Sequence, residues 1–202
     1  MKDIEIRSYG GEAAPKIDGR TIEGYAIVFN QRSKVLYDSG DKRFFREIIK
    51  PEAVTEDLLN RSDIKAVVEH DRTRLLARNN KGAGTLTLTI DEHGLRYSFD
   101  APKTADGDYA VEMVSRGDIN GSSFGFSAIR GKDDTWEKQP DGIWERNIVN
   151  IRFLSDVTVT ADPAYTQTEV SVRSLEEMEE PEPKKEEPKP YKVKLQLLRN
   201  NI

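Results

Sequence analysis

Hydrophobic and polar residues alternate along most of the first 173 residues, which predicts a domain built mainly from β-strands. Alternation, or a high content of β-branched and aromatic residues, predicts strands over residues 21–29, 63–70, 122–130 and 147–160. A hairpin is predicted over residues 85–100, an amphipathic helix over residues 106–116, and a shorter helix from Pro51 to about Leu59. These elements indicate an α+β, mainly β domain with an antiparallel, barrel-like sheet flanked by a few helices.

The composition changes sharply after Ser174. Residues 175–190 read LEEMEEPEPKKEEPKP, with four Pro, seven Glu and three Lys, and such a segment has too few apolar residues to fold on its own. Residues 191–202 regain some apolar character. We therefore expect a domain over residues 1–174, a flexible, disordered linker over residues 175–190, and a short C-terminal segment that serves for docking or as a scaffold-like remnant.

The overall composition excludes several classes of function. The chain has no cysteine, which rules out disulfides, thiol nucleophiles and cysteine-bound zinc. Two histidines and a net charge of -5 argue against a metal site and against nucleic-acid binding. No apolar run is long enough to cross a membrane, and acidic residues stand where a signal peptide would be apolar, so we expect a cytosolic protein without a cofactor.

His70 is the first candidate for chemistry. It is the last residue of a predicted strand, on the face of that strand's apolar residues, and its imidazole would suit a general base near neutral pH. The competing interpretation is an ordinary histidine at the rim of a strand. His93 falls in the predicted hairpin turn, where polar residues are common, and we do not expect it to be catalytic.

Ser123 is the candidate nucleophile. Alternation in the segment GSSFGFS (residues 121–127) places Phe124 and Phe126 on one face and Ser123 with Gly125 on the other. We expect Ser123 to face outward beside a glycine that leaves room for a peptide. Ser122 is the alternative nucleophile, although alternation would point it toward the phenylalanines.

Asp156 is the third candidate, because a carboxylate inside a strongly β-prone segment needs a partner. Alternation would place it on one face with Arg152, Leu154 and Thr158. It could orient an imidazole as the third member of a triad, or it could pair with Arg152 as a structural ion pair. The residues themselves leave this choice open.

The order of several short motifs is more specific than any one of them. They are GYAIVFN (residues 24–30), FREII (45–49), PEAV (51–54), EHD (69–71), GDINGSSFGF (117–126), LSDVTV (154–159), DPAY (162–165) and VRS (172–174). Over residues 22–174 this order resembles the prohead maturation proteases of tailed phages, serine peptidases related in fold to the herpesvirus protease assemblin.

The resemblance implies a barrel-like β fold and a catalytic set composed of His70, Ser123 and Asp156, where the acidic position is often Glu in the family. Arg146 and Arg152 are candidate contributors to the oxyanion site.

The resemblance also implies a role and a place of action. The expected function is an endopeptidase that cleaves the scaffolding segment of the major capsid protein, and itself, inside the immature prohead in the host cytoplasm. Its partners would be the capsid protein and further copies of this chain, with no nucleic acid, membrane or metal. The alternative is a non-catalytic assembly protein with a protease-like body, which a separation of Ser123 and His70 beyond about 5 Å would favour.

Overall fold

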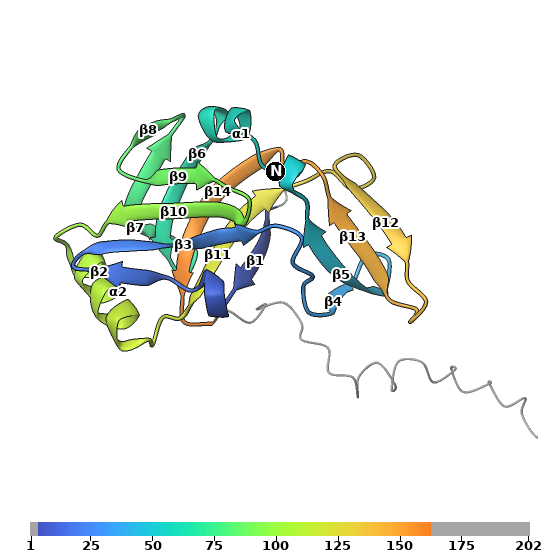
Figure 1. Cartoon of the computed structure of the whole chain (residues 1–202), viewed down its shortest axis with the longest axis horizontal. Coiled ribbons are helices and arrows are strands. Elements are labelled where there is room, and N and C mark those ends of the chain that lie inside the picture. Colours follow the sequence, from blue (N-terminus) through green and yellow to red (C-terminus); the bar gives the residue numbers. More distant parts are fainter. Residues whose placement is uncertain (1–3, 163–202) are drawn as a thin grey trace, which may run out of the picture. The chain divides into compact units, whose positions relative to one another are not determined.

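A computed structural model describes residues 4–162 of the protein. The predicted linker and the predicted C-terminal segment lie outside these residues, as does the end of the predicted domain. Within the described part, most residues of the regular structure belong to strands, which confirms the mainly β class (Figure 1).

The strands form three sheets. The six-stranded sheet has the order β1 (Glu5–Tyr9), β11 (Gly121–Ser127), β14 (Phe153–Thr160), β6 (Asp63–Val68), β7 (Asp71–Asn80) and β8 (Ala83–Gly84). The second sheet has the order β2 (Lys16–Asp18), β3 (Thr21–Val28), β10 (Gly94–Asp100) and β9 (Thr87–Ile90). The third has the order β12 (Asp134–Lys138), β13 (Trp144–Ile148), β5 (Arg43–Ile49) and β4 (Leu36–Asp38).

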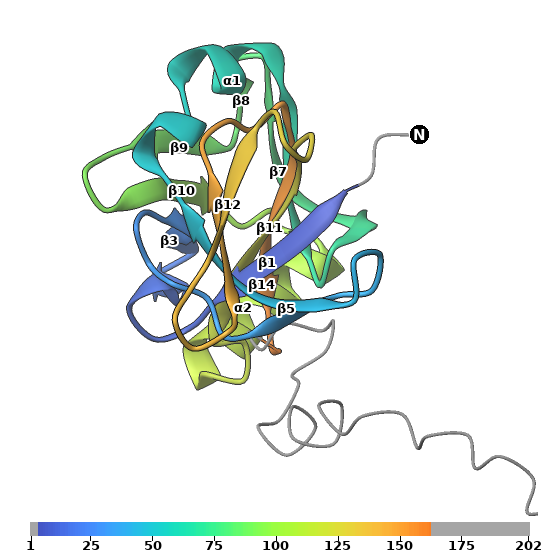
Figure 2. The same ribbon diagram turned by 90° about the vertical axis from the view of Figure 1, so that its right-hand side faces the viewer.

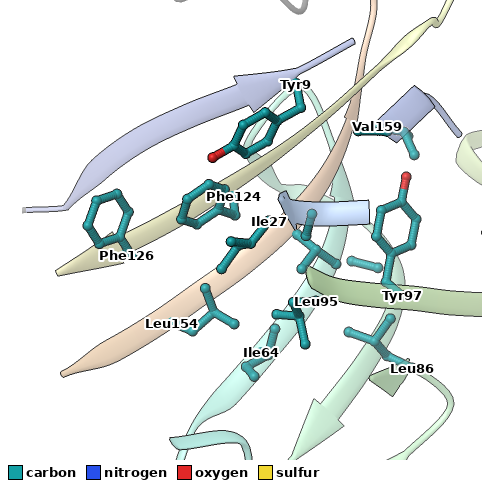
Figure 3. Packing of buried hydrophobic residues seen from close by; sticks show 14 of the residues in the cluster. Tyr9, Ile27, Ile64, Leu86, Leu95, Tyr97, Phe124, Phe126, Leu154 and Val159 are labelled. Carbon is teal, nitrogen blue, oxygen red and sulfur yellow. The ribbon is translucent and has the colours of Figure 1, made fainter. Parts of the chain in front are cut away.

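The main core lies between the six-stranded sheet and the second sheet. Phe124 and Phe126 of β11 are fully buried and belong to one cluster with Ile27 of β3 and with Leu95 and Tyr97 of β10 (Figure 3). Both phenylalanines therefore point inward from β11, as the alternation of that segment predicts. Their burial fixes the opposite face of β11 as the one that carries Ser123.

Two helices occur within residues 4–162. The predicted helix over residues 106–116 is α2 (Ala105–Arg116), where the Thr104 hydroxyl accepts a hydrogen bond from the Gly107 N–H and Gly117 ends the helix in the left-handed region at φ 79°. The predicted helix from Pro51 is divided. A 3₁₀ turn covers Pro51–Ala53, extended residues follow, and α1 (Glu56–Arg61) begins after Thr55.

Three details of the predicted sheet are wrong. The sheets are not closed into a barrel. They are also not purely antiparallel, because β14 pairs in parallel with β6, and β13 in parallel with β5. Finally, residues 147–160 do not form one strand, because the chain leaves the third sheet after Ile148 and joins the six-stranded sheet at Phe153.

A cluster of buried charges connects β1 with the third sheet. The Arg146 guanidinium on β13 donates hydrogen bonds to Glu5, Glu47 and Asp134, at distances of 2.5 to 3.0 Å. Arg7 donates to both oxygens of the Glu47 carboxylate at 2.7 and 2.9 Å. These contacts join the edge strand of the six-stranded sheet to the third sheet and so fix β1 beside β11.

No helix among residues 4–162 is long and apolar enough to cross a membrane.

Candidate active site

The structure brings the three predicted site residues into one chain of hydrogen bonds. The His70 Nδ1 atom lies 2.6 Å from Asp156 Oδ1, and the Nε2 atom lies 2.6 Å from Ser123 Oγ. Ser123 lies on β11 and Asp156 on the neighbouring strand β14, and β1 pairs with the other edge of β11 in the same sheet (Figure 2). The imidazole thus bridges a hydroxyl and a carboxylate, which is the arrangement of a Ser-His-Asp triad.

His70 does not lie in a strand, contrary to the prediction. β6 ends at Val68, which pairs with Asp71 on β7, so Glu69 and His70 form a two-residue hairpin turn. Both have positive φ angles, 51° for Glu69 and 56° for His70, as a type I′ turn requires. The turn directs the imidazole toward β14 and β11.

The Asp156 carboxylate accepts hydrogen bonds from three side chains. Besides His70, the Ser155 hydroxyl donates to Oδ2 at 2.5 Å and the Thr158 hydroxyl donates to Oδ1 at 3.0 Å. Burial alone would raise the pKa of Asp156, but the hydrogen bonds from His70, Ser155 and Thr158 outweigh it and lower the pKa. The group is therefore held as a carboxylate able to accept the Nδ1–H of His70.

The surroundings of Asp156 differ from those expected in two respects. The structural alternative, a pair with Arg152, is wrong, because the Arg152 guanidinium donates to Asp133. Leu154 is on the opposite face and joins the core, since the register between β11 and β14 shifts at Ser155. This bulge places Ser155 next to the carboxylate, a position that regular alternation does not predict.

The Ser123 hydroxyl is enclosed, and the expectation that it faces outward into open space is wrong. Ser123 has 0% exposure. Its Oγ accepts a hydrogen bond from the Ser8 hydroxyl at 2.9 Å and lies 2.8 Å from the backbone oxygen of Arg7. Because the hydroxyl has one proton and two acceptors, His70 Nε2 and the Arg7 oxygen compete for it.

Ser122, the alternative nucleophile, points to the other side of β11. Its hydroxyl lies 2.8 Å from the Tyr97 hydroxyl and donates to the Ala13 oxygen at 2.7 Å, and the residue is fully buried. No hydrogen bond joins it to His70 among the contacts of the described residues. Ser122 therefore belongs to the packing between the two sheets.

Gly125 has a different role from the one predicted. A Cβ atom at this position would lie 2.4 Å from Ser155 Oγ and 2.7 Å from Asp156 Oδ2. The glycine thus leaves room for the Asp156 carboxylate and for the Ser155 hydroxyl that binds it. The predicted role was to leave room for a peptide substrate.

Neither arginine suggested for the oxyanion site contacts the Ser123 hydroxyl. Arg146 is held by the buried cluster of Glu5, Glu47 and Asp134, and Arg152 is held by Asp133. His93 lies in the turn between β9 and β10, with its ring edge-on to Tyr25 at 4.5 Å between centroids. The structure assigns none of these three residues a contact with the reacting groups.

Sequence reasoning missed three supporting hydroxyls. Alternation already places Thr158 on the face of Asp156, so its hydrogen bond to the carboxylate could have been expected, and Ser155 is the direct neighbour of Asp156 in the chain. Nothing in the sequence indicates Ser8, because its contact with Ser123 depends on the pairing of β1 with β11, whose residues are more than a hundred positions apart in the chain.

A cavity of about 610 Å³ adjoins β1. Its walls include Ile4, Ile6 and Ser8 of β1, together with aromatic and arginine side chains of the third sheet such as Trp136 and Arg146. Ser8 is shared between this cavity and the hydrogen bonds of Ser123. Within residues 4–162, no group of His, Asp or Glu side chains has the arrangement of a metal site.

Comparison with known proteins identifies the family. No curated protein and no solved structure matches the chain. The family of caudovirus prohead serine proteases matches residues 3–181, which is most of the 202-residue chain. The chain therefore belongs to the caudovirus prohead serine protease family.

Proposed function

We propose that the protein is a serine endopeptidase in which Ser123 is the nucleophile, His70 the general base and Asp156 the group that orients the imidazole. Family membership supports serine peptidase activity in capsid maturation. The observation that carries the assignment of residues is the continuous hydrogen-bonded path Ser123–His70–Asp156, with 2.6 Å at each step.

The hydrogen bonds of this path indicate which group donates a proton and which accepts it. Asp156 accepts the Nδ1–H of His70, which leaves the lone pair of Nε2 free to accept the Ser123 proton. As Oγ bonds to the substrate's carbonyl carbon, that proton moves to Nε2 and then to the departing amine. The peptide C–N bond breaks, and the acyl group stays on Oγ as an ester. Water then attacks this ester with His70 again as the base, the bond from the acyl carbon to Oγ breaks, and the proton passes from His70 back to Oγ as the acid product leaves.

The substrates we propose are the scaffolding segment of the major capsid protein and the protease chain itself. Activity of this kind would take place inside the immature prohead in the host cytoplasm, with the capsid protein and other copies of the protease as partners. The family supports the association with capsid maturation, and these specific substrates follow from the resemblance in sequence.

A non-catalytic assembly protein is the competing function. It would have no need for a serine and a histidine within hydrogen-bonding reach, and a separation beyond about 5 Å would have favoured it. The 2.6 Å between His70 Nε2 and Ser123 Oγ supports the peptidase instead.

The test is the intact mass of wild type, Ser123→Ala and Ser122→Ala after each is co-expressed with the cognate capsid precursor. We expect truncated precursor with wild type and with Ser122→Ala, and intact precursor with Ser123→Ala. Thermal unfolding of the purified variants checks that both are folded. Equal cleavage by Ser123→Ala would contradict the assignment of the nucleophile, and no cleavage by folded wild type would favour the assembly protein.

A further inference from the structure

The turn that carries His70 has an uncommon backbone. Glu69 and His70 are both non-glycine residues in the left-handed region, whereas two-residue turns of this type are usually Asn-Gly or a similar pair. Such a conformation persists in a folded protein when neighbouring contacts hold it. The contacts that hold this turn are therefore part of what places the imidazole.

The Glu69 carboxylate supplies those contacts. Its Oε2 atom accepts a hydrogen bond from the Thr160 hydroxyl at 2.6 Å, and its Oε1 atom accepts one from the Ala161 N–H at 2.6 Å. The Glu69 N–H in turn donates to the Val159 oxygen at 3.2 Å. Three contacts from one residue thus attach the turn to the end of β14.

The same strand also holds the imidazole directly. Alternate residues of β14 face the turn, with Asp156 2.6 Å from His70 Nδ1, Thr158 Oγ1 3.2 Å from the same atom, and Thr160 bound to Glu69. β14 therefore fixes His70 at two places, its ring through Asp156 and its backbone through Glu69. Loss of the Glu69 carboxylate would leave the turn attached to β14 only through the Glu69 N–H and the contacts of the imidazole.

We propose that Glu69 is a positioning residue of the active site, whose carboxylate holds the β6–β7 turn so that His70 stays between Ser123 and Asp156. This inference rests on the proposed function, since it takes His70 as the base that acts on Ser123. Glu69 does not touch the reacting atoms and acts through the backbone of its neighbour.

A second turn of the same sheet provides a matched control. Lys81 and Gly82 connect β7 to β8 through a two-residue turn that is closed by the pair Asn80 and Ala83, and their φ angles are also positive, at 56° and 85°. Lys81→Gly replaces a non-glycine residue in the left-handed region with glycine, as Glu69→Gly does, and so relieves the same backbone strain. It leaves the contacts of His70 unchanged.

The experiment compares full-length wild type, Glu69→Gly, Glu69→Gln and Lys81→Gly by proton NMR, thermal unfolding and cleavage of the capsid precursor. The NMR signal is the downfield proton of the hydrogen bond between His70 Nδ1 and Asp156. The chain has two histidines, so a His93→Gln background makes its assignment unambiguous. Glutamine can accept from the Ala161 N–H and donate to the Thr160 hydroxyl, so it should restore both contacts.

We expect Glu69→Gly to remain folded, to lose or broaden the downfield signal, and to lower kcat about 100-fold with little change in KM, because misplacement of a catalytic group by about 1 Å has an effect of this size. Glu69→Gln should recover the signal and most of kcat. Lys81→Gly should match wild type in both measurements.

A Glu69→Gly variant with the wild-type signal and wild-type kcat would overturn the proposal. So would equal losses in Glu69→Gly and Lys81→Gly, because these would show a general effect of the turns. If wild type shows the signal but cleaves no precursor, the proposed function fails, while the NMR comparison still decides whether Glu69 positions His70. Absence of the signal from wild type would contradict the geometry on which the proposal rests.

Discussion

Gly125 lies two residues beyond Ser123 on β11, and its lack of a side chain determines where the Asp156 carboxylate can sit. In Gly125→Ala the new methyl group would be placed 2.4 Å from Ser155 Oγ, 2.7 Å from Asp156 Oδ2 and 3.3 Å from Ile4 Cγ2. The first two distances are shorter than carbon and oxygen atoms tolerate, so at least one of these polar groups must move.

The expected loss of stability in Gly125→Ala follows from the hydrogen bonds that the displaced groups lose. The Ser155 hydroxyl lies 3.0 Å from the Gly125 oxygen and 2.5 Å from Asp156 Oδ2, two acceptors that share its one proton, and it cannot keep both contacts while it avoids the methyl group. Overpacking in a tight interior costs about 1–3 kcal/mol, and an unsatisfied buried hydrogen-bonding group costs about 1–3 kcal/mol. Because rotation of Ser155 relieves part of the overlap, we expect the free energy of unfolding to fall by about 2–4 kcal/mol.

Activity should fall as well, because the clash involves the carboxylate that orients His70. A displacement of Asp156 by a fraction of an ångström would lower kcat by about ten-fold or more. Urea unfolding gives the change in stability, and the rate of capsid-precursor cleavage gives the change in kcat. Gly40→Ala is the matched control, since Gly40 is exposed and a Cβ atom there would lie 3.3 Å from Asp38 Oδ1, a milder overlap that involves no residue of the candidate site.

A double-mutant cycle with Ser155→Ala sharpens the test. If the methyl group acts by displacing the Ser155 hydroxyl, the double variant should be less destabilised than the sum of the single variants, because the same hydroxyl is lost only once. Gly125→Ala with the stability and activity of wild type would refute the argument. Strict additivity would mean that Ser155 is not the group displaced.

Three further predictions concern the charged groups. Arg146→Ala leaves the buried Asp134 carboxylate without its arginine and removes one of the two arginines that bind Glu47, so it should destabilise the protein by about 3–5 kcal/mol in urea unfolding, and a loss below about 1 kcal/mol would contradict this. Asp156→Asn would turn an amide toward the Ser155 and Thr158 hydroxyls and should lower kcat about 10⁴-fold through loss of the required imidazole tautomer, while the protein still folds by circular dichroism. Burial alone would raise the pKa of Asp133, but hydrogen bonds from Arg152 and Asn150 lower it to about 2, below the value of about 3.9 in an unfolded chain. Asp133 therefore stabilises the fold above about pH 4 and loses that contribution as the pH falls toward 2, so stability measured over this interval should decline less steeply in Asp133→Asn than in wild type.

Strand alternation predicted the fold class and the inward face of β11 because both depend on local periodicity. Phe124 and Phe126 enter the core and Ser123 points away from it, so the choice of Ser123 over Ser122 as the residue nearer His70 could be made from the sequence. The sequence could not indicate how the strands combine into sheets, since parallel pairing of β14 with β6 joins residues about ninety positions apart.

The site differs from the prediction at two places for one reason, which is that the alternation argument assumes regular strands. A bulge at Ser155 reverses the face of Leu154, and a two-residue turn at Glu69 removes His70 from its strand. Each irregularity depends on contacts between strands that are distant in sequence, such as Glu69 with Thr160. The residue types of the candidate site were therefore predictable, whereas the geometry that joins them was not.

The enclosure of Ser123 could not be predicted from alternation either. Alternation shows which face a serine occupies, but not what lies over that face, and here β1 contributes both the Ser8 hydroxyl and the Arg7 oxygen. These two contacts have opposite consequences. The Ser8 hydroxyl donates to Oγ and leaves the Ser123 proton available to His70, whereas the Arg7 oxygen accepts that proton and competes with the base. In the proposed mechanism, attack on a peptide therefore requires the Ser123 proton to be directed to His70 and Oγ to become accessible, and both conditions depend on the contacts that β1 makes with Ser123.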